Sequence, residues 1–179
     1  MSSLGCDSSL IPNTLKKKLE DLAGGAGLAR TARQSLRDLF ARGGEEAIRN
    51  HTAILDHLPP EGSIEERIGR LTARDLGAGV KADDPWCLGL LGAAADYVAA
   101  GLAELLSQGW GEERIILGGS IAIHVGGFID RIRLGLTERQ RLPQAAPGLT
   151  AFDPAHQLVL AGLGEERGIL GAVLLTDLH

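Results

Sequence analysis

Residues 114–122, which read RIILGGSIA, combine the residue types that a nucleotide-binding turn needs. The apolar, β-branched run at 115–117 predicts a short buried strand, and Gly118, Gly119 and Ser120 predict a tight turn into a helix. Glycines let a ligand approach the backbone closely, and a helix N-terminus offers free N–H groups and the positive end of the helix dipole. Such a turn suits a ribose or a phosphate. A Gly-Gly pair after a strand is also common in ordinary strand-to-helix turns that bind no ligand.

Histidines and cysteines are the other side chains that could do chemistry. His51 and His57 lack a second set of ligands at metal-binding spacing, so we expect them on the surface. Cys6 and Cys87 are the two cysteines of the chain, and neither belongs to a C-x-x-C pair. This usage predicts neither a zinc site nor a disulfide framework, and it fits a reducing, cytoplasmic setting.

Length and composition restrict the class of protein. The 179 residues correspond to one ordinary domain or to one lobe of a larger fold. The net charge is −5 with both signs interspersed, which does not favour direct contact with nucleic acid or with an anionic membrane. No uninterrupted apolar run approaches the roughly 18 residues that span a bilayer, and the start lacks the pattern of a secretory signal. We therefore expect a cytoplasmic protein without a membrane partner.

The first part of the chain predicts helices. Residues 1–13 form a polar lead-in, and a helix capped by Thr14 follows. Apolar residues at helical spacing predict further helices over 28–41 and 45–58, separated by a pair of glycines.

Two helix starts with clear capping chemistry come next. Thr72 and Asp75 have the form of a capping box, and Asp84 followed by Pro85 predicts an N-cap with proline in the first helical position. The second of these helices should reach about Ser107. Its many glycines and alanines leave a face of small residues that permits very close helix packing.

The remainder of the chain alternates strands and helices. After the strand at 115–117 we expect a helix from about 121 to 141, an irregular connection at 143–154, a strand at 158–160 and a last helix at 165–175. A strand–helix–strand–helix order implies neighbouring parallel strands covered by helices.

Three segments in this order resemble the C-terminal part of the ROK family (repressor, open reading frame, kinase) of sugar kinases and sugar-responsive repressors. Residues 71–75 (LTARD) through Asp84-Pro85 and the long helix look like the family's T-A-x-D … G-D-P segment. Residues 115–122 are similar to its I-V-L-G-G-G-V-A turn, with Ser120 in place of the third glycine. Residues 161–172 (AGLGEERGILGA) resemble its closing A-L-G-x-x-A-G-x-x-G-A. The match covers roughly residues 70 to 176.

This resemblance implies an α/β fold: the C-terminal lobe of an actin-like, hexokinase-like (ribonuclease H-like) ATPase, rich in helices around a small parallel or mixed sheet. The lobe would span 14–179, with a helical part at 14–70 and a nucleotide-side part at 71–179. It implies ATP with Mg²⁺ as the ligand. The residues that it assigns to the adenosine pocket are Gly118, Gly119, Ser120, Gly162, Gly164 and Gly168.

Glu20 is the residue that the resemblance assigns to a sugar. Residues 19–25 are similar to the family's L-E-A-x-A-S-G, whose glutamate binds sugar hydroxyls, and a carboxylate can accept hydrogen bonds from two adjacent hydroxyls. An equally good interpretation is a solvated helix residue near Lys16 and Lys17 at ion-pair spacing. The preceding stretch lacks the family's cysteine-rich zinc motif, so no zinc is implied.

The sequence holds none of the family's phosphoryl-transfer segments: no D-x-G-x-T, no Asn-Asp pair, no G-T-G-x-G-G loop and no E-x-G-H. Phosphoryl transfer is mostly positioning and charge neutralisation, which those segments supply. We therefore expect a nucleotide-side lobe that is inactive alone and that works with a missing N-terminal kinase half or as a homo-oligomer. The alternatives are a non-catalytic sugar-sensing or dimerisation module of a ROK-type regulator, and an unrelated α/β domain whose glycines serve packing.

Overall fold

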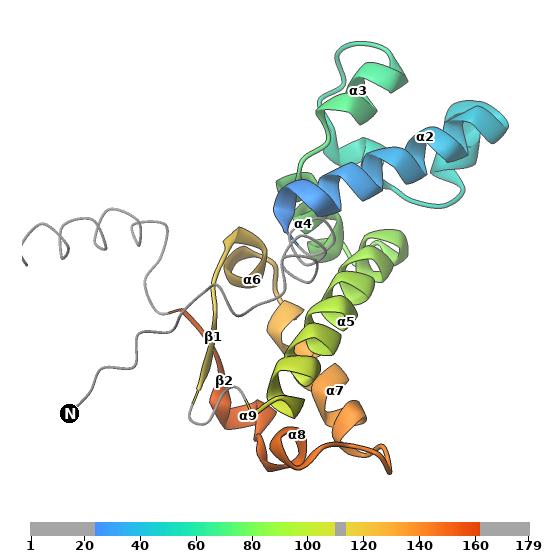
Figure 1. The fold of residues 1–179 in the computed structure, drawn as a ribbon. Coiled ribbons are helices and arrows are strands. Elements are labelled where there is room, and N and C mark those ends of the chain that lie inside the picture. The colour runs from blue at the N-terminus through green and yellow to red at the C-terminus, as the bar shows by residue number, and fades with distance from the viewer. Residues whose placement is uncertain (1–23, 110–113, 162–179) are drawn as a thin grey trace, which may run out of the picture.

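A computed structural model describes residues 24–109 and 114–161 (Figure 1). The predictions for Glu20, Gly162, Gly164 and Gly168, and those for the helices at 14–22 and 165–175, lie outside these residues. The elements in chain order are α2 (Gly25–Arg49), the 3₁₀ helix η2 (Ile54–His57), α3 (Ile64–Arg70), α4 (Ala73–Lys81), α5 (Pro85–Ser107), β1 (Ile115–Leu117), α6 (Ser120–His124), α7 (Phe128–Gln140), α8 (Pro147–Ala151), α9 (Pro154–Gln157) and β2 (Leu158–Leu160).

The described chain is rich in helices and contains a two-stranded parallel sheet, which agrees with the coarse α/β prediction. β1 and β2 pair in register, with Ile115 opposite Leu158 and Leu117 opposite Leu160. Four helices, α6 to α9, connect the two strands, as a parallel pair requires a crossover. The two strands lie on one side of α5 and α7 in Figure 1.

The core is built around α5, which packs most extensively along α7. A Cβ atom added at Gly135 of α7 would lie 2.9 Å from the Cβ of Ala99 of α5, so the two helices approach as closely as a glycine allows. At Ala99 this confirms the close helix packing that the small residues of α5 predicted, whereas Ala93 and Ala100 are exposed. Both predicted starts are confirmed as well, because Thr72 and Asp75 form a capping box and the Asp84 side chain caps α5.

Among the described residues, α5 is a helix whose length and apolar composition would allow it to cross a membrane. The core helix of a soluble protein satisfies the same two criteria. Its inner face packs against α4, α7 and α8, and residues such as Leu91, Ala99 and Leu106 are buried there.

The predicted helix at 45–58 is wrong beyond Arg49. The predicted break before it appears as a kink inside α2, where Gly44 adopts a φ of 67°. After α2 the chain turns into η2, because the Thr52 hydroxyl accepts a hydrogen bond from the backbone N–H of Ile54 at 3.0 Å. This local contact competes with helix continuation, as threonine side chains commonly do.

Three further elements differ from the predictions. The helix expected at 121–141 is divided into α6 and α7 at Gly127, whose φ is 79°. The connection at 143–154 is irregular only in part, since prolines at first-turn positions begin α8 and α9. α3 was not predicted, although Ser63 and Glu66 form a complete capping box at its start.

Candidate functional site

The glycine corner, residues 118–120, joins β1 to α6 as the sequence predicted. Gly119 is the N-cap of α6 and has φ 104° and ψ 154°, a conformation that is essentially restricted to glycine. Gly118 and Gly119 are exposed, and a Cβ atom added at Gly119 would meet no atom of the described residues within 4 Å. The corner is therefore an open backbone surface whose geometry requires glycine at position 119.

The end of β2 lies directly beside this corner. The backbone N–H of Ala161 donates a hydrogen bond to the Leu117 carbonyl at 2.8 Å, so the carboxyl ends of the two parallel strands meet. In open α/β sheets, ligands bind in the crevice outside these carboxyl ends. The structure thus brings residue 161, which directly precedes the second glycine-rich segment in the sequence, to the same sheet end as Gly118.

Two hollows of the described surface lie away from this corner. One of about 530 Å³ runs along α2 between Arg30, Gln34, Asp38 and Arg42, and another lies at Glu61 and Arg70 before and within α3. The glycine corner lines neither of them. Within residues 24–109 and 114–161, no group of three or more His, Cys, Asp or Glu side chains is placed to hold a metal ion.

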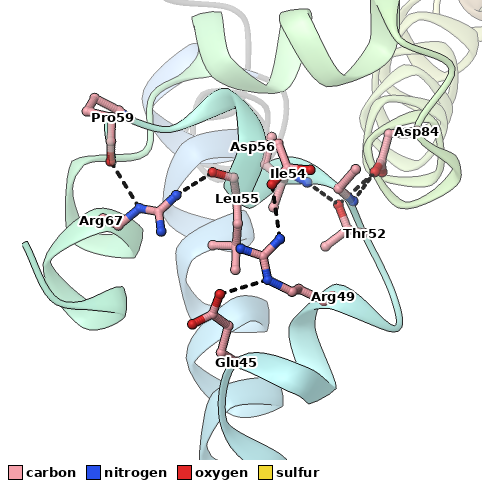
Figure 2. A network of polar contacts seen from close by, with 10 residues as sticks. Glu45, Arg49, Thr52, Ile54, Leu55, Asp56, Pro59, Arg67 and Asp84 are labelled. Carbon is pink, nitrogen blue, oxygen red and sulfur yellow. Dashed lines mark hydrogen bonds and ion pairs between the residues drawn. The ribbon is translucent and has the colours of Figure 1, made fainter. Parts of the chain in front are cut away.

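A second arrangement of polar groups surrounds Asp84, which is only 5% exposed (Figure 2). Its Oδ2 accepts hydrogen bonds from Thr52 Oγ1 at 2.9 Å and from the Ala53 N–H at 2.7 Å, and its Oδ1 accepts from the Cys87 N–H at 2.9 Å. Burial raises the pKa of Asp84, but these donors outweigh it and hold the pKa below its ordinary value. Because both oxygens have protein donors, the carboxylate joins the start of α5 to the segment before η2 and does not present a free catalytic group.

Cys87 lies next to this carboxylate and is also unsuited to catalysis. Burial, with the negative charge of Asp84, raises the pKa of the thiol to about 12. The thiolate form, which is the nucleophile, is therefore negligible near neutral pH. Gly79 packs so closely on the sulfur that an added Cβ atom would lie 2.4 Å from Cys87 Sγ.

Two arginines hold the η2 segment from the outside (Figure 2). Arg49 contacts Glu45 at 2.7 Å and Asp56 at 3.0 Å, and Arg67 donates to the carbonyls of Pro59 and Leu55. All of these partners are other parts of the same chain, so the cluster positions η2. Exposed ion pairs of this kind contribute little to stability.

The sequence located the corner but not the Asp84 contacts. It predicted Asp84 as a helix cap, and the additional bonds to Thr52 and Ala53 span 32 and 31 residues. A single threonine inside the helix predicted at 45–58 carries no pattern that identifies such a partner. No family model matches the chain, and neither the curated proteins nor the solved structures contain a match. The likeness to the ROK family therefore rests on the motifs quoted above.

Proposed function

We propose that this chain is a ROK-like nucleotide-side lobe that binds the adenosine of ATP, accompanied by Mg²⁺, at the glycine corner. The observation that carries the proposal is the backbone of Gly119, which is exposed, has a φ of 104°, and has no described atom within 4 Å of the place where a side chain would project. It lies at the carboxyl end of a parallel strand, beside Ala161. Gly162, Gly164 and Gly168 would complete the pocket, and Glu20 would contact a sugar.

The chemistry of the corner supports binding without phosphoryl transfer. Two glycines and a serine offer backbone N–H and C=O groups and one hydroxyl, which can hydrogen-bond a ribose. They offer no cation to neutralise a transferring phosphoryl group and no carboxylate to activate a hydroxyl, and transfer needs both. We therefore assign the chain a binding role, with catalysis requiring phosphoryl-transfer groups that this corner does not supply.

Isothermal titration calorimetry with ATP–Mg²⁺ tests this assignment. Gly119→Ala introduces strain and a methyl group at the proposed ligand surface. The affinity of this variant for ATP–Mg²⁺ should therefore fall by at least about tenfold, which is 1.4 kcal/mol. Gly127→Ala is the matched control, because Gly127 also has a positive φ of 79° and also has nothing within 4 Å of an added Cβ. The proposal fails if the wild-type chain releases no heat up to millimolar nucleotide, or if both variants lose binding equally.

The second candidate is a non-catalytic sugar-sensing or dimerisation module. It is favoured by the exposed surface of α5, a largely apolar helix in which Tyr97 is 53% exposed. Size-exclusion chromatography with light scattering, with and without candidate sugars, separates the two functions. A sugar-dependent change of mass without any nucleotide binding would favour the module.

A further inference from the structure

The two-stranded sheet packs inward on one face and is open on the other. Residues that lie opposite each other in a parallel sheet point to the same side, so Ile116 and Val159 share one face, here called the outer sheet face. Ile116 is 65% exposed, and neither residue belongs to the core. Apart from Leu160 at its carboxyl end, the opposite face packs inward, through Leu158, Ile115 and Leu117.

The exposure of Ile116 is unusual for a residue in a parallel strand. Parallel sheets occur almost only where both faces are covered, because the helices of their crossover connections lie on them. Here α7 and α9, which belong to the connection between the strands, contact β2, and Leu158 is fully buried. Within the described residues, Ile116 has no comparable cover.

The chain leaves β2 at a point from which it can reach the outer sheet face. The backbone N–H of Ala161 still donates to the Leu117 carbonyl at the carboxyl end of the sheet, and residues 162–179 follow. Among them, residues 169–175 read ILGAVLL and form the longest apolar run outside the described residues. Because the inner face already packs against the core, the outer sheet face is the surface of the sheet that this run can cover.

We propose that residues 165–175 form a helix that packs across the outer sheet face, with Ile169, Ala172 and Val173 against Ile116. These three residues have the i, i+3, i+4 spacing of one face of a helix. The apolar spacing predicts the helix, and the exposed isoleucine of β1 determines where it packs.

The lengths of the two segments fit this arrangement. Residues 162–164 span at most about 11 Å when extended, and a neighbouring layer of a fold lies about 10 Å from a sheet. A helix over 165–175 would be about 16 Å long, which exceeds the roughly 10 Å of a three-residue strand. It would therefore run back from the carboxyl end of the sheet and cover both strands along their whole length.

The helix should depend on this contact for its own stability. Gly168 and Gly171 weaken a helix relative to alanine, and isolated helices shorter than about 12–15 residues are marginal in water. Removing the apolar contact at Ile116 should therefore unfold residues 165–175 while the rest of the chain stays folded.

Hydrogen exchange of the full chain, followed by mass spectrometry, tests the contact. The peptide containing residues 169–175 should be protected in the wild type, and Ile116→Asp should speed its exchange at least about tenfold. Leu134→Asp is the matched control, because Leu134 is 58% exposed but lies on α7, and the peptide should stay protected in this variant. Circular dichroism verifies that each variant is folded. The readout needs no nucleotide, so it remains decisive if the glycine corner binds nothing.

A double-mutant cycle in the full chain tests whether positions 116 and 173 contact each other. Ile116→Asp and Val173→Asp should each raise the equilibrium constant of unfolding at least about tenfold. The double variant should be little less stable than either single variant, because the first substitution already releases the helix. Leu134→Asp and Val173→Asp should instead be additive.

Four results would each overturn the proposal. They are an unprotected 169–175 peptide in the wild type, equal effects of Ile116→Asp and Leu134→Asp, additive effects at positions 116 and 173, and protection that is lost on dilution. The last result would assign the outer sheet face to a second copy of the chain.

Discussion

Thr52 Oγ1 donates a hydrogen bond of 2.9 Å to Asp84 Oδ2 across 32 residues of sequence, and both residues are buried. The same carboxylate caps α5 through the Cys87 N–H and accepts from the Ala53 N–H. One side chain thus fixes the start of the central helix and its distance from η2. Because α5 packs on α7, which leads toward β2, this contact also supports the frame that carries the glycine corner.

Removing the Asp84 carboxylate should destabilise the fold strongly. Asp84→Ala leaves two buried donors without partners, and we expect a loss of about 2–4 kcal/mol in the free energy of unfolding. Urea denaturation followed by circular dichroism measures it. Asp153 is a suitable control, because it caps α9 through the Ala155 N–H at 2.9 Å but is exposed, so Asp153→Ala should have a much smaller effect. Equal losses in both variants would show that the buried contacts of Asp84 add nothing.

The lowered pKa of Asp84 predicts how its contribution depends on pH. A carboxyl whose folded pKa lies below its unfolded value stabilises the fold above the unfolded pKa, about 4, and loses that contribution as pH falls through the folded pKa. The stability difference between the wild type and Asp84→Asn should therefore be constant from pH 7 to about pH 5 and shrink at lower pH. Urea unfolding at intervals between pH 7 and pH 2.5 measures this difference. A difference that grows on acidification would contradict the assigned direction.

Gly79 should not tolerate a larger residue. The added methyl of Gly79→Ala would overlap Cys87 Sγ, so we expect a cost of about 1–3 kcal/mol. In a Cys87→Ala background the sulfur is absent and most of this cost should disappear. Gly89→Ala, at a helical position with nothing within 4 Å, should instead stabilise the protein by about 0.5–1 kcal/mol. A cost at Gly79 that is the same in both backgrounds would rule out the sulfur contact as its cause.

Cys87 should resist alkylation in the folded protein. Its buried thiol, with a pKa of about 12, is almost wholly protonated at pH 8, so alkylation should be far slower than for an ordinary cysteine. Treatment with iodoacetamide, digestion and mass spectrometry of the peptide containing Cys87 report its modification. Labelling should appear only after denaturation. Rapid labelling of Cys87 in the native protein would mean that the site is accessible and would contradict its burial.

Local chemistry in the sequence predicted those parts of the fold that depend on neighbouring residues. The proline and aspartate at the start of α5, the capping box of α4 and the strand–turn–helix at 115–120 are all contacts within a few residues. The failures have long-range or competing causes. Thr52 ends the helical segment through a hydroxyl whose other partner is 32 residues away, and Gly127 divides the helix expected at 121–141 although the apolar spacing continues across it.

In the candidate site, too, the local contacts were predictable and the long-range contacts were not. The sequence predicted a tight glycine turn between a strand and a helix, and Gly119 confirms it with a φ of 104°. That residue 161 would lie against Leu117 depended on the parallel pairing of β1 with β2, which short apolar strands suggest but do not fix.

Amide-resolved NMR of the ¹⁵N-labelled chain during titration with ATP–Mg²⁺ tests the central claim most directly. The account predicts saturable chemical-shift changes at Gly118, Gly119 and Ala161, with little change at Gly127. In Gly119→Ala these changes should require at least about tenfold more nucleotide. No change at the glycine corner up to millimolar nucleotide, or changes confined to the hollow along α2 near Gln34, would contradict the assignment of this corner as a nucleotide site.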